Sequence, residues 1–105
     1  MTIGDSVTSI EQETFRGCTS LIKVTIGDSV TSIGEWAFQG CISLTEITIP
    51  KSVTNIDIEI FYLCENLKTI NYIGTQEEWN FINFYPSWDG GMPSDYVINY
   101  NYVVQ

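Results

Sequence analysis

The octapeptide Ile-Gly-Asp-Ser-Val-Thr-Ser-Ile occurs twice in the chain, at residues 3–10 and again at residues 26–33. An altered third copy, Ile-Pro-Lys-Ser-Val-Thr-Asn-Ile, follows at residues 49–56, so that successive copies begin 23 residues apart. Self-similarity at a fixed period of about 20 to 50 residues is the sequence signature of a stacked-repeat protein. We therefore predict a solenoid, a fold whose long regular surface usually serves for binding.

The residues that recur in all three units, 2–24, 25–47 and 48–70, are apolar or small, whereas the charged positions drift. One coil cannot bury its apolar side alone, so each inward residue must meet its counterpart in the next coil. The recurring columns therefore predict the core. They are Ile3/Ile26/Ile49, Val7/Val30/Val53, Ile10/Ile33/Ile56, Phe15/Phe38/Phe61, Cys18/Cys41/Cys64, Leu21/Leu44/Leu67 and Val24/Ile47/Ile70.

Local spacing predicts the elements of each coil. Residues 21–26 alternate at their end and are β-branched, which predicts a strand, and residues 30–33 predict a second short extended piece. Residues 36–38 fit one or two helical turns, and Gly17 and Gly40 stand where a glycine would end such a turn. The third unit has Leu63 at that position, so we expect a different cap there.

The pattern Ile-(Gly/Pro)-x-Ser-Val-Thr-x-Ile, with Phe, Cys and Leu following at fixed spacing, resembles the BspA-type (treponemal-type) leucine-rich repeat over residues 2–70. The commonest family form has Ile-Pro and Ala-Phe, which occur here only at Pro50 and Ala37. The resemblance implies an α/β repeat fold, a curved leucine-rich-repeat solenoid with the strands on its concave side. It also implies a microbial protein on the cell surface or secreted, acting in adhesion or in contact with host or matrix proteins.

The 105 residues predict one domain, made of three repeats over residues 1–70 and a C-terminal capping segment over residues 71–105. Thr75 and Glu78 have capping-box spacing, which predicts a short helix from about Gln76 to Asn83. Trp79, Phe81 and Ile82 are expected to face the last coil.

The end of the sequence has a second strand signal. Residues 96–104 alternate and predict a terminal strand with Tyr96, Ile98, Tyr100 and Tyr102 on one face. We expect this strand to complete the closure of the stack.

The start of the chain lies directly within the first unit, because Met1 is followed by Thr2 and Ile3. We expect a piece of a longer protein, without a signal peptide in the piece itself. Its first coil is then expected to expose apolar side chains and to form a homodimer through this uncapped face. The alternative is that Met1 folds over the edge and the chain stays monomeric. The side chains concerned are Ile3, Val7, Ile10, Phe15, Leu21 and Val24.

The net charge of −9 results from 13 acidic and 4 basic residues, with no histidine. Clustered Lys and Arg are needed to bind phosphates, so nucleic acid and anionic membranes are not expected partners. The sequence has no run of 18 apolar residues, and we expect no membrane insertion.

The three cysteines, Cys18, Cys41 and Cys64, occupy one column. We expect a ladder of buried thiols, although stacked positions about 5 Å apart leave a disulfide possible on distance alone. No histidine or closely spaced second cysteine accompanies them, so we expect no metal and no cofactor.

An enzyme is not expected, because histidine chemistry is excluded and no phosphate-binding glycine loop is present. The leading interpretation is a protein-binding adhesion module that uses the outward positions of the strand ladder. Two alternatives remain open: a carbohydrate-binding site that uses Tyr85 and Trp88, and a purely structural spacer or cap. The nine outward positions are Ile22, Lys23, Thr25, Thr45, Glu46, Thr48, Lys68, Thr69 and Asn71.

Overall fold

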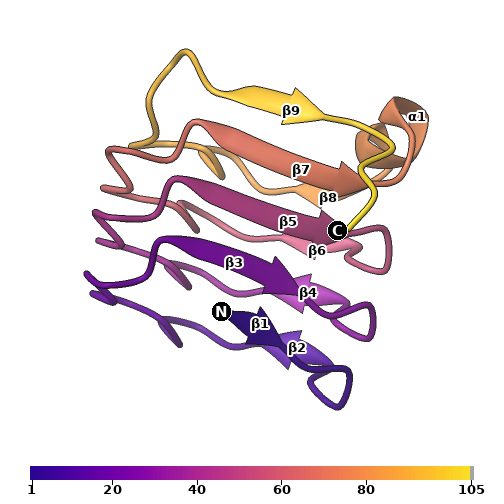
Figure 1. Cartoon of the computed structure of the whole chain (residues 1–105), viewed down its shortest axis with the longest axis horizontal. Helices are drawn as coiled ribbons and strands as arrows, with labels where there is room; N and C mark the ends of the chain where they lie inside the picture. Colours follow the sequence, from indigo (N-terminus) through magenta and orange to yellow (C-terminus); the bar gives the residue numbers. More distant parts are fainter. Residues whose placement is uncertain (105) are drawn as a thin grey trace.

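Each unit forms one coil of a solenoid and contributes one strand to each of two parallel sheets (Figure 1). The computed structural model describes residues 1–104. The five-stranded sheet has the order β1 (Thr2–Ile3), β3 (Lys23–Ile26), β5 (Glu46–Pro50), β7 (Thr69–Ile73) and β9 (Val97–Asn99). The four-stranded sheet has the order β2 (Ser9–Ile10), β4 (Ser32–Ile33), β6 (Asn55–Ile56) and β8 (Asn83–Phe84).

The strand register places each residue beside its counterpart in the next repeat. Val24 pairs with Ile47, and Ile47 pairs with Ile70. In the four-stranded sheet, Ile33 pairs with Ile56. The predicted leucine-rich-repeat solenoid is therefore confirmed, with the repeat period set by the parallel pairing.

The recurring columns form the core between the two sheets and the turns that connect them. Val30, Phe38, Cys41 and Leu44 of the second coil have no exposed surface. Phe38 stacks between two equivalent rings, with centroids 5.2 Å from Phe15 and 5.8 Å from Phe61. The ladder of identical side chains thus buries each coil against the next.

The side of the coil opposite the five-stranded sheet consists of consecutive turns, where the sequence predicted helical turns. The Ala37 amide donates to the Gly34 carbonyl at 3.1 Å, a three-residue closure. Trp36 has a left-handed φ of 58°, which interrupts any helix at that residue. Its amide bonds instead to the Ile58 carbonyl of the next coil at 3.3 Å, so stacking supplies the hydrogen bond that a helix would have made.

Leu63 takes the same left-handed turn as the glycines at its repeat position. Its φ is 65°, compared with 73° at Gly17 and 74° at Gly40. The expectation of a different cap was wrong, because stacking against the neighbouring coils holds the turn in place even without glycine. A side chain in this conformation costs roughly 1–2 kcal/mol.

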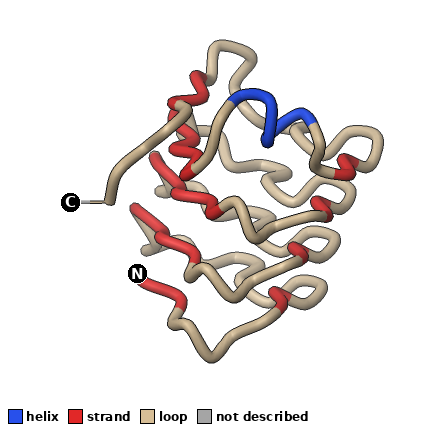
Figure 2. The backbone as a smooth tube through the Cα atoms, turned by 90° about the vertical axis from the view of Figure 1, so that its right-hand side faces the viewer, coloured by secondary structure: helices blue, strands red, loops and turns tan. Residues whose placement is uncertain are grey.

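Both sheets continue beyond residue 70 through a longer coil. Pro50 pairs with Ile73 at an offset of 23 residues, whereas Asn55 pairs with Asn83 and Thr69 pairs with Val97, both at an offset of 28. The extra residues lie between β7 and β8, where the helix α1 (Gln76–Asn80) stands beside the stack (Figure 2). The predicted capping segment therefore covers the third coil by forming a fourth, longer coil that continues both sheets.

The helix α1 begins at the predicted capping box but ends earlier than predicted, at Asn80. The Glu78 amide donates to the Thr75 hydroxyl at 3.0 Å, and the Thr75 amide donates to the Glu78 carboxylate at 2.9 Å. Trp79 is buried as expected, with its ring 5.0 Å from that of Tyr72. The expectation for Phe81 was wrong, since this helix-terminal residue is 80% exposed while Ile82, the next residue, points inward.

The terminal strand is shorter than the predicted residues 96–104 and covers only Val97–Asn99. Asn101 has a φ of 55°, which ends the strand. The chain then returns to β7, where the Tyr102 amide donates to the Tyr72 carbonyl at 2.9 Å. Tyr96, Ile98, Tyr100 and Tyr102 alternate with exposed neighbours and are half-buried, as the sequence pattern predicted.

The first coil exposes less apolar surface than expected. Ile3, Ile10 and Val24 are buried within the single chain, and the other three side chains, Val7, Phe15 and Leu21, are half-buried. The amino group of Met1 donates to the Lys23 carbonyl at 2.8 Å and so ties the first residue to β3. Association through this coil stays a prediction.

Candidate interaction surface

Six of the nine positions predicted from the sequence lie in the strands of the five-stranded sheet, and the other three, Ile22, Thr45 and Lys68, directly precede those strands. We call the surface that these nine positions outline the ladder face. Four of its side chains are exposed, namely Ile22, Lys23, Thr45 and Lys68, and three are half-buried, namely Thr25, Glu46 and Thr69. The other two were expected at the surface but are buried, with Thr48 at 5% and Asn71 at 1% exposure. Seven of the nine positions thus remain accessible to a partner.

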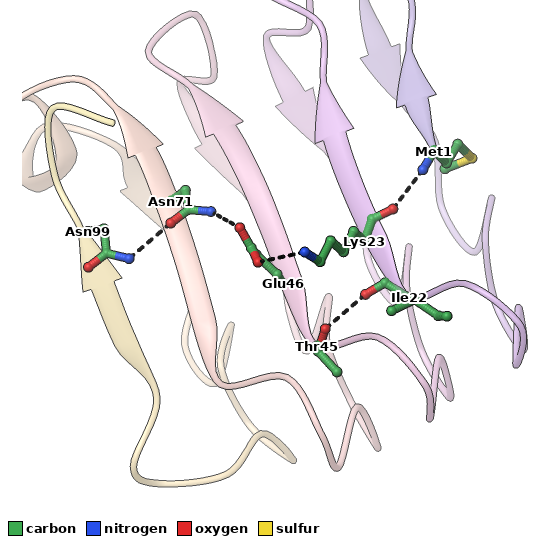
Figure 3. Close-up of polar contacts among 7 residues, drawn as sticks. All are labelled: Met1, Ile22, Lys23, Thr45, Glu46, Asn71 and Asn99. Carbon is green, nitrogen blue, oxygen red and sulfur yellow. Dashed lines mark hydrogen bonds and ion pairs between the residues drawn. The ribbon is translucent and has the colours of Figure 1, made fainter. Parts of the chain in front are cut away.

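A line of polar side chains crosses four strands of the ladder face (Figure 3). Asn99 on β9 donates to the Asn71 side-chain carbonyl at 3.0 Å, and Asn71 on β7 donates in turn to the Glu46 carboxylate. The other carboxylate oxygen of Glu46 lies 3.7 Å from the Lys23 ammonium on β3. These contacts fix the Glu46 carboxylate in the middle of the face.

Asn71 is buried and, through its hydrogen bond, holds the Glu46 side chain of the ladder face in place. A buried side-chain amide must be hydrogen-bonded to avoid a desolvation cost, and both ends of this amide are satisfied. The contact runs diagonally, because the residue paired with Glu46 is Thr69 and Asn71 lies two positions further along β7. Alignment of the repeats compares only equivalent positions of successive units, so it could not predict a hydrogen bond between non-equivalent positions.

The C-terminal tail runs outside the sheet near the ends of the strands. After Asn99 the chain turns back, and the Asn101 amide donates to the Gly74 carbonyl at 2.7 Å. The tail then descends on the outer side of the sheet from the end of β7 toward the end of β5 (Figures 1 and 2). This course leaves the beginnings of the strands free of the tail, and we call this part the open half of the ladder face.

Two lysines give the open half its charge. Lys23 is 70% exposed and is 3.7 Å from Glu46, and Lys68 is 62% exposed and lies 3.7 Å from Asp95. Ion pairs this exposed contribute only about 0–1 kcal/mol, because water screens them and the side chains lose entropy. Both ammonium groups can therefore exchange their present partner for a carboxylate on another molecule at little cost.

The cysteine column is a ladder of unpaired thiols, as the sequence predicted. Cys41 donates to the Phe15 carbonyl at 3.2 Å, and Cys64 donates to the Phe38 carbonyl at 3.0 Å, so each thiol bonds to the preceding coil. Interaction with the Cys41 thiol, together with burial, raises the pKa of Cys64. Burial, followed by the nearby Cys41, raises the pKa of Cys18. A side-chain hydrogen bond with Cys64 lowers the pKa of Cys41, but this thiol has no exposed surface, so we assign the column a structural role.

The two aromatic residues of the alternative site have different surroundings. Trp88 is half-buried in a cluster of rings, with its centroid 4.8 Å from Phe84 and 5.8 Å from Trp79. Tyr85 is 50% exposed and lines a groove of about 400 Å³ beside the four-stranded sheet. The ring of Trp88 thus serves the packing of the last coil, and Tyr85 stands at the surface without it.

Within residues 1–104, no three His, Cys, Asp or Glu side chains gather in an arrangement that could hold a metal ion. The helix found in the described part of the chain is too short to cross a membrane.

The stacked coils and the two parallel ladders define a leucine-rich-repeat solenoid. Residues 1–87 match the family model described as "BspA type Leucine rich repeat region (6 copies)". The chain belongs to the BspA-type leucine-rich repeat family. Membership of this typically non-enzymatic family fits a role as a protein-interaction or surface module.

Solved structures share the fold. A leucine-rich repeat protein from T. pallidum (TpLRR) matches 95% of the chain, with a TM-score of 0.67 and 20% identity. A leucine-rich repeat protein from Bacteroides ovatus matches 89% of the chain, with a TM-score of 0.60 and 23% identity. The chain spans 50% of the first protein and 28% of the second. No curated protein matches the chain.

Proposed function

We propose that this chain is a protein-binding module of a microbial surface or secreted leucine-rich repeat protein, and that it contacts a host or extracellular-matrix protein through the open half of the ladder face. Family membership supports the general role, since stacked-repeat proteins bind through their extended regular surface. The observation that carries the proposal is the cluster of Lys23, Glu46 and Lys68 at the beginnings of three neighbouring strands, where a hydrogen bond from Asn71 holds the Glu46 carboxylate and both ammonium groups are exposed.

The chemistry of this half suits a protein surface better than a small molecule. Its side chains combine two cations, one anion, threonine hydroxyls and the 56% exposed Ile22, spread over three neighbouring strands. Strand pairing holds their backbone, and Asn71 holds the Glu46 carboxylate, so little order is lost on binding. Because β5 lies between Lys23 and Lys68, we expect a partner that presents carboxylates about two strand spacings apart, together with an apolar contact for Ile22.

The test is a binding screen of the whole chain against immobilised extracellular-matrix and serum proteins, with a glycan array in parallel. Any protein that binds is then tested with the double variant Lys23→Ala/Lys68→Ala. The matched control is Arg16→Ala/Lys51→Ala, which removes the same amount of charge from the two other basic residues of the chain. We expect a loss of at least about tenfold in affinity for the first variant and little change for the control.

Two results would contradict this assignment. Equal losses in both double variants would mean that net charge, and not the ladder face, sets the affinity. Binding to glycans that is lost in Tyr85→Ala would place the function at the surface tyrosine and favour the carbohydrate-binding alternative.

A further inference from the structure

Phe81 has no packing role in its own coil. It is 80% exposed, more than any other large hydrophobic side chain in residues 1–104. It follows α1 in the insertion of the last coil, at the edge where the chain passes from the five-stranded to the four-stranded sheet (Figure 1). In repeat proteins, insertions into single repeats often map to a binding face.

A groove of about 210 Å³ lies directly beside this ring. The buried side chains of Val53, Tyr72 and Ile82 lie at its floor, and Phe81 itself forms part of its wall. Pockets for drug-sized ligands measure roughly 300–1,000 Å³, so this groove takes a single side chain rather than a whole small molecule. An exposed ring and a side-chain-sized groove with a mixed polar and apolar lining thus stand next to each other on one surface.

Two charged residues of opposite sign stand at the same groove. Lys51 and Glu78 both line it, and both are exposed. Glu78 belongs to the capping box, which fixes the position of its carboxylate. Lys51 and Glu78 therefore give this surface one positive and one negative point.

We propose that this surface binds a second copy of the chain, with Phe81 of each copy entering the groove of the other. A two-fold contact requires a self-complementary patch, in which each feature meets its complement on the partner. The ring and the groove meet this requirement, and the same rotation sets Lys51 of one copy near Glu78 of the other. The dimer closes on itself, because among the described coils the insertion that carries Phe81 occurs only in the last.

The contact is small, and the expected dimer is therefore concentration-dependent. Stable interfaces bury about 1,200–2,000 Å² in total, more than one ring and one groove per copy provide. Sedimentation velocity of the wild-type chain at rising concentrations, up to about 1 mM, should show a monomer–dimer equilibrium.

The decisive variant is Phe81→Ser, with Ile42→Thr as its control. Ile42 is also exposed, at 44%, but precedes β5 and so lies at the opposite edge of the solenoid. We expect Phe81→Ser to sediment as a monomer at concentrations where the wild type and Ile42→Thr are dimeric. Phe81 makes no buried contact in the single chain, so its replacement should leave the melting temperature of the monomer unchanged.

A charge variant tests the orientation of the two copies. Lys51→Glu sets two carboxylates opposite each other at each end of the proposed contact, and it should weaken the dimer at least tenfold at low salt. High salt should restore part of this loss, because it screens repulsion between exposed charges. A wild-type chain that stays monomeric up to about 1 mM would overturn the proposal. So would a dimer that persists in Phe81→Ser, which would direct attention to the first coil.

Discussion

At the residue scale, stacking between coils outweighs the local conformational preference of individual residues. Leu63 keeps the left-handed turn that glycine makes in the two preceding coils. A sequence comparison sees only the loss of glycine there, and it cannot show that neighbours on both sides hold the backbone. The local rule that a glycine ends such a turn therefore failed at Leu63, whereas the recurring apolar positions around it were predicted correctly.

Replacing Leu63 tests this cost directly. Leu63→Gly should raise the free energy of unfolding by about 0.5–1 kcal/mol, because relief of about 1–2 kcal/mol of backbone strain exceeds the entropic cost of glycine. Leu63→Ala keeps the strain and should not stabilise the chain. Urea denaturation of the three proteins measures both effects, and a glycine variant less stable than wild type would contradict the account.

The phenylalanine column offers a second prediction at this scale. Phe38 is fully buried between two rings, so Phe38→Ala should lower the free energy of unfolding by about 3–5 kcal/mol. Phe15 is half-buried and has one ring neighbour, so Phe15→Ala should cost clearly less. Equal losses at the two positions, measured by denaturant unfolding, would show that the ladder does not bury its members as described.

The thiols provide a third prediction, based on reactivity. Cys41 and Cys64 have no exposed surface, so a reagent in solvent reaches neither thiol in the folded chain, and the raised pKa of Cys64 further limits its thiolate. Ellman's reagent should label Cys18 first in the folded chain and all three cysteines only after unfolding in urea. Rapid labelling of three thiols in the native protein would contradict the buried ladder.

At the scale of elements, the short strands depend on their neighbours, and the helix depends on its cap. Strands of two to five residues would not persist alone, and each is held by parallel pairing to the equivalent strand of the adjacent coil. The helix α1 has only five residues, too few for independent stability, so its capping box and the buried Trp79 position it. The capping box was predictable because its spacing is local, whereas the early end of the helix was not, because it depends on where β8 joins the sheet.

The cap gives a prediction with a defined pH dependence. The hydrogen bond from the Thr75 amide, with Lys51 as a lesser contributor, lowers the pKa of Glu78 below its ordinary value of 4.5. A lowered folded-state pKa means that the Glu78 carboxylate stabilises the fold above pH 4.5 and that this contribution disappears as the pH falls through the folded value. Glu78→Gln should thus be less stable than wild type at pH 7, and the difference should shrink below pH 4.5. A difference that stays constant across this range would show that the carboxylate charge contributes nothing.

At the scale of the whole molecule, periodicity predicted three coils but concealed the fourth. The insertion that carries α1 changes the sequence offset between paired residues from 23 to 28. The residues of the fourth coil therefore no longer fall into the expected columns. Two hydrogen bonds mark the continuation, from the Glu59 amide to the Ser87 carbonyl and from the Tyr85 amide to the Ile56 carbonyl. The left-handed turn also recurs, at Gly91 with a φ of 83°. A search that allowed an insertion would have had Gly91 as its signal.

The candidate site was predictable in position but not in accessibility. Alternation accounts for the outward positions within each strand, such as Lys23 and Thr25, because successive side chains of a strand point to opposite faces. It does not account for Ile22, Thr45 and Lys68, which precede the strands. Thr48 and Asn71 are buried although they occupy outward positions, and the Asn71–Glu46 hydrogen bond crosses the register. Neither feature has a local sequence signal, so both required the structure.

The claim that the ladder face is the binding surface is tested most directly by hydroxyl-radical footprinting of the chain, free and bound to a partner from the screen. Ile22 on the open half and Tyr85 beside the four-stranded sheet are both exposed and report on different faces. The account predicts that binding protects Ile22 from oxidation and leaves Tyr85 as reactive as in the free chain. Protection of Tyr85 with no change at Ile22 would contradict it.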